Sequence, residues 1–245
     1  MRFLIGLVVG AIIAAAIGAA AIAYAARDGE LGHFIISDDD DRERGGDHKD
    51  SGDVITRKVD LRDFDRIDVR GVFELDVDVG GADFAIELSG DAKDLDRVEA
   101  SVEDGELILD QKKREKGARR RGHDSVTATI RMPALVSIKA SGVVDGDVKG
   151  VAASAFKAEI SGVGDMELAG TCDTLTADVS GVGDLDAQAL ECKTVKVTVS
   201  GVGDASVYAS EVVDATVSGM GEISVSGSPE TVEKNGGMFS SINVK

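Results

Sequence analysis

Aromatic residues are scarce in this chain of 245 residues, which holds 7 Phe, 2 Tyr and no Trp. Wide globular cores usually depend on aromatic side chains for volume. Proline is also nearly absent, with 2 residues against 30 Gly, so glycine must make the turns. The composition therefore predicts a narrow core, filled by Val, Ala, Leu and Ile, with many tight glycine-built corners.

Positive charge is in short supply, and the formal net charge is −18 at pH 7. Such an acidic surface would be repelled by a phosphate backbone, so we expect no nucleic-acid partner. The acidity favours solubility and permits divalent cation binding without requiring it.

Charge is missing altogether from residues 3–26, which follow Arg2. A helix of this length spans a bilayer, with the N-terminus in the cytoplasm. Ala23-Tyr24-Ala25 also resembles the cleavage site of a signal peptide. Residues 1–26 are therefore predicted to be either a cleaved signal peptide or a transmembrane anchor. On both interpretations the rest of the chain is exported, to the periplasm or the cell surface.

Residues 27–57 lack apolar periodicity and include the run Asp38-Asp39-Asp40-Asp41. Like-charge runs repel and stay extended, which predicts an acidic disordered linker. A folded head is predicted for residues 58–243.

The head begins with β-structure that has no obvious repeat. Apolar and acidic residues alternate over 73–79, and the alternation returns after Gly80-Gly81. Asp104-Gly105 predicts a hairpin turn, and residues 126–132 predict a strand that Pro133 ends. The basic cluster at 112–121 is either a solvated loop or a contact for anionic lipid or acidic polysaccharide.

The second half of the head is repetitive. Five units spaced 18 to 20 residues apart begin with the same motif: Ser141-Gly-Val-Val-Asp, Ser161-Gly-Val-Gly-Asp, Ser180-Gly-Val-Gly-Asp, Ser200-Gly-Val-Gly-Asp and Ser218-Gly-Met-Gly-Glu. A fixed period near 20 indicates a solenoid in which each unit is one coil. Stacked coils align like residues into inward columns, for example Ile160, Val179, Val199 and Val217.

We therefore predict an all-β fold, a right-handed parallel β-helix with coils of 18–20 residues, preceded by the N-terminal signal or anchor helix. Glycine is expected at each corner because it adopts the required backbone angles at little cost. The turn-forming residues are Gly162, Gly164, Gly181, Gly183, Gly201, Gly203, Gly219 and Gly221.

Cys172 and Cys192 fall at nearly the same offset in successive units. Stacked coils bring such residues within disulfide range, and an exported compartment would oxidise them. We predict a disulfide, with two buried free thiols as the alternative.

An acidic residue ends each corner motif, and these residues also align in a column. The column allows two interpretations: a calcium ladder, with Asp165, Asp184 and Asp204 as candidate ligands, or carboxylates that bind backbone N–H groups at the turn. The 20-residue period differs from the nine-residue calcium repeat, so we predict no metal site and no cofactor.

The repeated Ser-Gly-(Val/Met)-Gly-(Asp/Glu), together with Phe64-x-x-Ile67-x-Val69-x-Gly71-x-Phe73-x-Leu75-x-Val77, resembles the bacterial head GIN domain family of auto-transporter adhesin heads. The resemblance covers about residues 58–243. It implies a right-handed β-helix, export and an adhesin-like role, and it supplies no catalytic residues. The irregular first unit and the basic insertion at 112–121 depart from the family pattern.

These features predict a non-enzymatic, adhesin-like binding or structural module of the cell envelope. All three His lie outside the repeats, and Ser and Asp recur in every unit as turns require, whereas an active site would be singular. One alternative is a calcium-dependent polysaccharide-active enzyme, and another is a self-associating envelope scaffold. The expected partners are a cell-surface or glycan ligand, a second copy of the chain, and the membrane if the N-terminal helix is retained.

Overall fold

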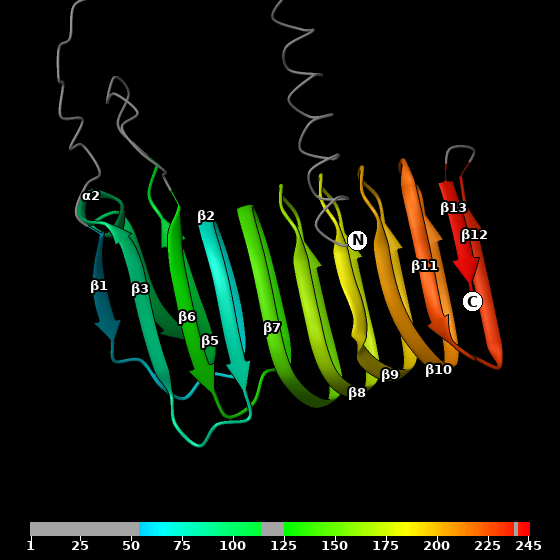
Figure 1. Cartoon of the computed structure of the whole chain (residues 1–245), viewed down its shortest axis with the longest axis horizontal. Coiled ribbons are helices and arrows are strands. Elements are labelled where there is room, and N and C mark those ends of the chain that lie inside the picture. Colours follow the sequence, from blue (N-terminus) through cyan, green and yellow to red (C-terminus); the bar gives the residue numbers. More distant parts are fainter. Residues whose placement is uncertain (1–53, 114–124, 238–239) are drawn as a thin grey trace, which may run out of the picture. The chain divides into compact units, whose positions relative to one another are not determined.

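The computed structural model of the chain describes residues 54–113, 125–237 and 240–245 (Figure 1). These residues form strands and one short helix, α2 (Ala92–Leu95). The strands are β1 (Val54–Val59), β2 (Arg66–Val79), β3 (Ala85–Asp91), β4 (Val98–Glu103), β5 (Glu106–Gln111), β6 (Val126–Met132), β7 (Ser137–Ile160), β8 (Met166–Val179), β9 (Leu185–Val199), β10 (Ala205–Val217), β11 (Gly221–Gly227), β12 (Thr231–Gly236) and β13 (Ser240–Val244).

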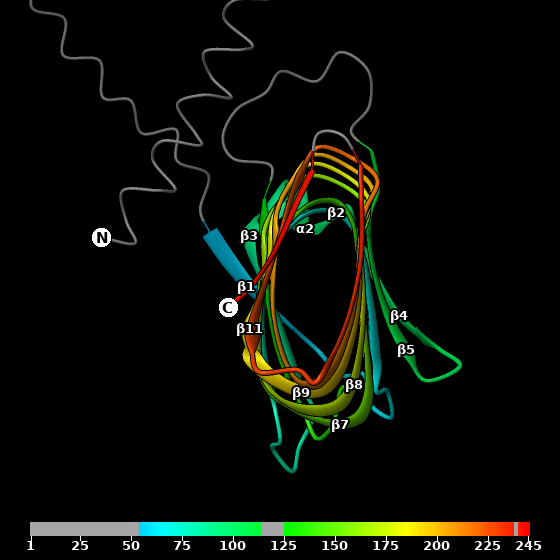
Figure 2. The same cartoon turned by 90° about the vertical axis from the view of Figure 1, so that its right-hand side faces the viewer.

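Strands β7 to β10 lie side by side in parallel register, and we call them the stack (Figure 1). Ala177 pairs with Val197, and Val197 pairs with Ala215 one repeat further on. Their side chains are buried, while the residues between them face outward. The predicted inward columns are therefore confirmed in their register, and Figure 2 shows the successive repeats superimposed.

Strand β2 stacks on β7 in the same parallel register, although the sequences between them are unrelated to the repeat. Gly71 pairs with Gly142 and Val72 with Val143, so Arg70-Gly-Val-Phe-Glu74 aligns with the first corner motif. The repeats thus continue one unit further toward the N-terminus than their motif indicates. The intervening residues, which include β3 to β6, form an insertion between two adjacent repeats.

The prediction of a right-handed parallel β-helix over residues 58–243 is wrong, because the sheet is mixed. Strand β3 is antiparallel to both β1 and β6, and β4 is antiparallel to β5. The hairpin β4–β5 turns at Asp104-Gly105 as predicted, and β5 pairs with β2 (Figure 2). Alternation of apolar and polar residues predicts which face of a strand is buried. It carries no information on the direction of the neighbouring strand.

Three predictions lie wholly or mostly outside the described residues. These are the signal or anchor helix at 1–26, which was part of the predicted fold, the acidic disordered linker at 27–57 up to residue 53, and the basic cluster beyond Lys113. The described residues begin at Val54, so strand β1 includes the last residues assigned to the linker. Among the helices of the described residues, none has the length and apolarity needed to cross a membrane.

Candidate functional site

The corner motifs of successive repeats lie directly on one another. Val143, Val163, Val182, Val202 and Met220 are joined in order by parallel β-bridges. The backbone N–H of Val182 donates to the carbonyl oxygen of Gly162 at 2.8 Å, and that of Val202 donates to Gly181 at 2.9 Å. The corners are therefore hydrogen-bonded into the stack like the strands, and their outward side chains are held in fixed rows.

The two glycines of each corner are required for different reasons. A Cβ atom on Gly162 would lie 2.1 Å from the carbonyl oxygen of Gly142 in the preceding repeat, which is too close for any side chain. Gly164 has the same conflict with Val144, at 2.2 Å, and also a φ of +136°. The predicted reason, permissive backbone angles, therefore explains only part of the pattern. At the first glycine, the close approach of the neighbouring backbone is what excludes a side chain.

The middle residue of each corner stands out from this glycine surface. Val143, Val163, Val182, Val202 and Met220 are 44%, 52%, 46%, 46% and 57% exposed. We call these five side chains the valine ridge. With strands about 4.8 Å apart, four steps make the ridge about 19 Å long. Apolar side chains in one contiguous exposed row are typical of an interaction surface.

An acidic column runs beside the valine ridge, two residues further along each corner. It consists of Asp145, Asp165, Asp184, Asp204 and Glu222, all at least partly exposed. The Oδ1 atom of Asp184 accepts the backbone N–H of Asp204 at 2.8 Å, and the Oδ1 atom of Asp165 accepts that of Asp184 at 2.9 Å. Each of these two aspartates thus accepts a backbone N–H from the next repeat.

These bonds bear on the candidate calcium ligands Asp165, Asp184 and Asp204, each of which uses one oxygen for a backbone N–H. No cluster of three or more metal-binding side chains occurs within residues 54–113, 125–237 and 240–245. Partial burial raises the pKa of Asp184; the backbone N–H of Asp204 opposes this rise, and the charges of Asp165 and Asp204 add to it. The geometry therefore fits carboxylates that tie repeats together.

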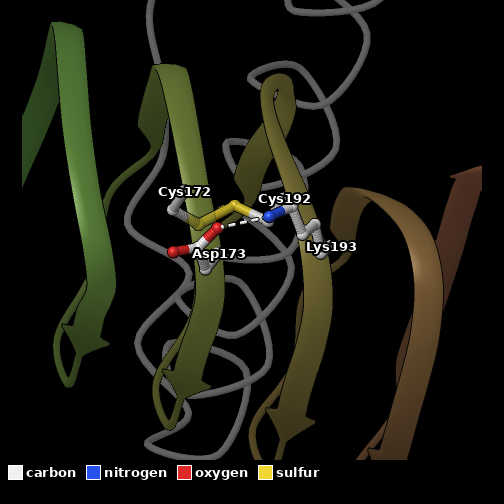
Figure 3. The surroundings of a disulfide bond; sticks show 4 residues. All are labelled: Cys172, Asp173, Cys192 and Lys193. Atoms are coloured by element: carbon white, nitrogen blue, oxygen red, sulfur yellow. Dashed lines mark hydrogen bonds and ion pairs between the residues drawn. A yellow bond between two sulfur atoms is a disulfide. The ribbon is translucent and has the colours of Figure 1, made fainter.

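Cys172 and Cys192 face each other across β8 and β9, with their Cα atoms 4.6 Å apart, and the structure joins them in a disulfide (Figure 3). The next residues, Asp173 and Lys193, form an ion pair of 2.8 Å on the surface above it. The carboxylate of Asp173 raises the pKa of Lys193, chiefly through their hydrogen bond. A depression of about 320 Å³ opens at this place, and Tyr208 of β10 lies on its wall.

The structure brings together, by repeat, the glycines, aspartates and cysteines that the sequence singled out. Sequence reasoning missed the valine ridge, because it treated the middle residue only as part of a turn motif. A usable signal was present in the sequence. The middle residue lies outside the inward columns yet is Val or Met in all five motifs, where most other outward positions hold Lys, Glu, Asp, Thr or Ser.

Comparison with known proteins identifies a family that the chain matches. A family model described as "Putative auto-transporter adhesin, head GIN domain" matches residues 63–229. No curated protein matches the chain. A crystal structure described as a putative adhesin, from Bacteroides fragilis, is 25% identical with a TM-score of 0.66, and the match covers 78% of this chain and 97% of that one.

Two further solved structures are more distant. A putative lipid binding protein from Parabacteroides distasonis is 21% identical with a TM-score of 0.46, covering 80% of this chain and 98% of that one. A putative adhesin from Parabacteroides merdae is 19% identical with a TM-score of 0.44, covering 80% and 97%. The family match covers most of the chain and confirms the resemblance seen in the corner motifs: the protein belongs to the head GIN domain family of adhesin-like proteins.

Proposed function

We propose that this protein is an exported, adhesin-like binding module of the cell envelope that docks a partner polypeptide along the valine ridge. The partner would carry apolar side chains flanked by Lys or Arg. The observation that carries the proposal is the row of five exposed apolar side chains on a hydrogen-bonded scaffold. Sites on rigid elements hold their binding groups in place without an ordering cost.

Folding alone does not explain an apolar residue at the middle of the corner. The β-bridges between corners use backbone atoms only, so Ser or Thr would make them equally well. Val182 and Val202 leave almost half of their surface in water, so only the buried part of each side chain contributes to folding. A binding role gives a physical reason for keeping Val or Met at all five places.

The charge beside the ridge selects among partners. The acidic column runs parallel to the ridge, and the whole chain carries a net charge of −18. Two copies packed ridge to ridge would bring two chains of net charge −18 together, and an anionic lipid surface would be repelled in the same way. A partner with basic side chains beside its apolar ones would be attracted by the acidic column. A second copy of the chain or an anionic lipid surface would be repelled by it.

Three observations support export to the periplasm or cell surface. Residues 3–26 lack charge and suit a signal peptide or a retained anchor. A disulfide at Cys172 and Cys192 persists in an oxidising compartment. The family is one of adhesin-like proteins, which suggests the outside of the cell.

The alternatives are less well supported by the geometry. A calcium-dependent enzyme needs clustered metal ligands, but Asp165, Asp184 and Asp204 each use one carboxylate oxygen to accept a backbone N–H of the next repeat. A scaffold that self-associates through the ridge would bring like charges together. Neither the enzyme nor the scaffold therefore accounts for an apolar row beside an acidic one.

The test is a binding titration of the protein with three synthetic peptides of equal length. One is an amphipathic Leu–Lys peptide, one is a Lys peptide of the same charge, and one is a Leu–Glu peptide. We expect the Leu–Lys peptide to bind at least tenfold more tightly than the Lys peptide, and the Leu–Glu peptide to bind least. Added salt is expected to weaken the Leu–Lys complex, because screening reduces the contribution of the acidic column.

The variant Val163→Ser/Val182→Ser/Val202→Ser keeps all charges and should lose at least tenfold in affinity for the Leu–Lys peptide. The matched control is Val54→Ser/Ile55→Ser/Val232→Ser, which removes exposed apolar residues elsewhere and should bind as the unchanged protein does. Equal affinity of the ridge variant and the control would contradict the proposal.

A further inference from the structure

The depression beside the disulfide is built from three successive repeats. Thr171 pairs with Glu191, and Glu191 pairs with Tyr208, which places the three side chains in one row. Asp173, Lys193 and Ser210 come from the same three strands and also line the depression. Its volume of about 320 Å³ is near the lower end of the range for small-ligand sites, roughly 300–1,000 Å³.

The residues around this depression are held in place. The disulfide joins Cys172 of β8 to Cys192 of β9, and the ion pair between Asp173 and Lys193 links the same two strands (Figure 3). On the third strand, the ring of Tyr208 leans over Gly227, whose position would put a Cβ atom 3.4 Å from the ring. The site is therefore formed in advance of any ligand, which lowers the cost of binding.

The depression breaks the regularity of the repeats, unlike the corner. Tyr208 is one of two tyrosines in the chain, and it is half-buried where other repeats carry Thr171 and Glu191. The stack contains a single disulfide, joining β8 and β9. A specific ligand site needs a combination of residues that the other repeats lack, and the depression has such a combination.

We propose that this depression binds a sugar residue of a glycan, with Tyr208 as the stacking platform. An aromatic face packs against the apolar face of a sugar ring, and the Tyr208 hydroxyl remains available for a hydrogen bond. The carboxylates of Asp173 and Glu191 accept hydrogen bonds from ring hydroxyls, while Lys193 donates. Thr171 and Ser210 add hydroxyls that can donate or accept.

The charges of the depression narrow the class of sugar. Two carboxylates and one ammonium group leave a net charge of −1 at the site. An uncharged or amino-substituted hexose suits this balance, because its hydroxyl and ammonium groups donate to carboxylates. A uronic acid would place a further negative charge beside Asp173 and Glu191. The site is distinct from the valine ridge and would serve a second kind of partner.

The test is ligand-observed saturation-transfer NMR on the full chain with glucose, galactose, N-acetylglucosamine, glucosamine and glucuronate as separate probes. We expect saturation transfer to at least one uncharged or amino sugar, and the weakest transfer to glucuronate. Tyr208→Ala should weaken the best sugar at least tenfold. Tyr208→Phe, which keeps the ring, should stay within about threefold, since the aromatic face that stacks on the sugar is unchanged.

Two outcomes would overturn the assignment. One is the absence of transfer to every sugar in the panel, and the other is sugar binding that Tyr208→Ala leaves unchanged. The ridge variant Val163→Ser/Val182→Ser/Val202→Ser serves as the folded control and should bind the sugar normally. Loss of peptide binding with sugar binding retained would separate the two sites, so either proposal can fail without the other.

Discussion

The regular stack and the mixed sheet before it differ in how their backbone groups are paired by hydrogen bonds. In β7 to β10, each repeat lies on the last in parallel register, and its corner donates backbone N–H groups to the neighbouring corner. In β1 to β6, antiparallel pairs and a hairpin complete the sheet. Within the stack, each repeat therefore provides backbone hydrogen-bond partners for the next repeat. At the end of the series no further repeat is present, so a specific side chain must provide the partner.

That specific residue is Gln111 at the end of β5. In the stack, the N–H of the middle corner residue donates to the glycine carbonyl of the repeat before it, as Val182 donates to Gly162. Val72 lies in the first corner of the series, and its N–H instead donates to the Oε1 atom of Gln111 at 3.1 Å. Gln111 is 8% exposed, and its Cβ lies against Gly71. The amide side chain thus takes the place of a missing repeat.

The largest expected effect comes from adding a methyl group where two repeats touch. In Gly181→Ala, the new Cβ would lie 2.0 Å from the carbonyl oxygen of Gly162. We expect a loss of at least about 3 kcal/mol in the free energy of unfolding, because the backbones must separate. Gly81→Ala in the mixed region has nothing within 4 Å and should stay within about 1 kcal/mol. Urea unfolding measures both, and equal losses would argue against tight contact at the corner.

The second effect concerns the covalent link between repeats. Cys172→Ala/Cys192→Ala removes a bond that closes a loop of 20 residues. We expect a loss of about 3 kcal/mol, mainly from greater freedom of the unfolded chain. Thermal unfolding with and without reductant provides the measurement. Reductant should lower the melting temperature of the unchanged protein toward that of the variant. If reductant changes the melting temperature of neither protein, a stabilising disulfide is excluded.

The third effect tests the end of the repeat. Gln111→Ala leaves the N–H of Val72 without the Gln111 oxygen, which should cost about 1–3 kcal/mol. Gln188→Ala, an exposed residue of the stack, is the matched control and should change little. Hydrogen exchange adds a local readout, since the Val72 amide should lose protection before the amides of Val182 and Val202. Unchanged exchange at Val72 would show that Gln111 does not replace a repeat.

The smallest effect is the pH dependence of the acidic column. Burial raises the pKa of Asp184, so the folded state holds this proton more tightly than the unfolded chain does. Its favourable contribution is present below the ordinary value of 3.8 and is lost as pH rises through the raised pKa. Asp184→Asn keeps an acceptor oxygen and removes the charge. The variant should melt about 1–2 °C higher at pH 7 and show no gain at pH 3.

The exposed Asp186→Asn change controls for net charge in this comparison and should produce a smaller gain at pH 7. A lower melting temperature for Asp184→Asn at pH 7 would mean that the charge itself stabilises the column.

The sequence was informative where residues repeat and much less so where they do not. The spacing of the corner motifs predicted the pairing of Ala177 with Val197, because equal lengths bring equivalent residues into register. It did not reveal that Gly71 continues the series, since the inserted strands separate it from Gly142 by 71 residues of chain. Strand direction in β1, β3 and β4 depends on which edges meet in space, and no local pattern encodes that choice.

The candidate sites were likewise predictable from the sequence only where their residues repeat. Repetition made the aspartate and glycine rows visible in the sequence, while the depression at Tyr208 depends on side chains from three strands that only the fold brings together. The valine ridge required knowledge of exposure, because Val in a strand-rich sequence normally indicates the core.

The most direct test of the account is the spacing along the valine ridge, on which both the fold and the proposed function depend. Spin labels at cysteines introduced for Val143 and Met220, and in a second protein for Val72 and Met220, allow their separations to be measured by double electron–electron resonance. Four and five steps of about 4.8 Å predict separations near 19 and 24 Å before allowance for the labels, a difference of about one strand spacing. Equal separations, or distances well above 30 Å, would contradict the in-register stacking of the corners.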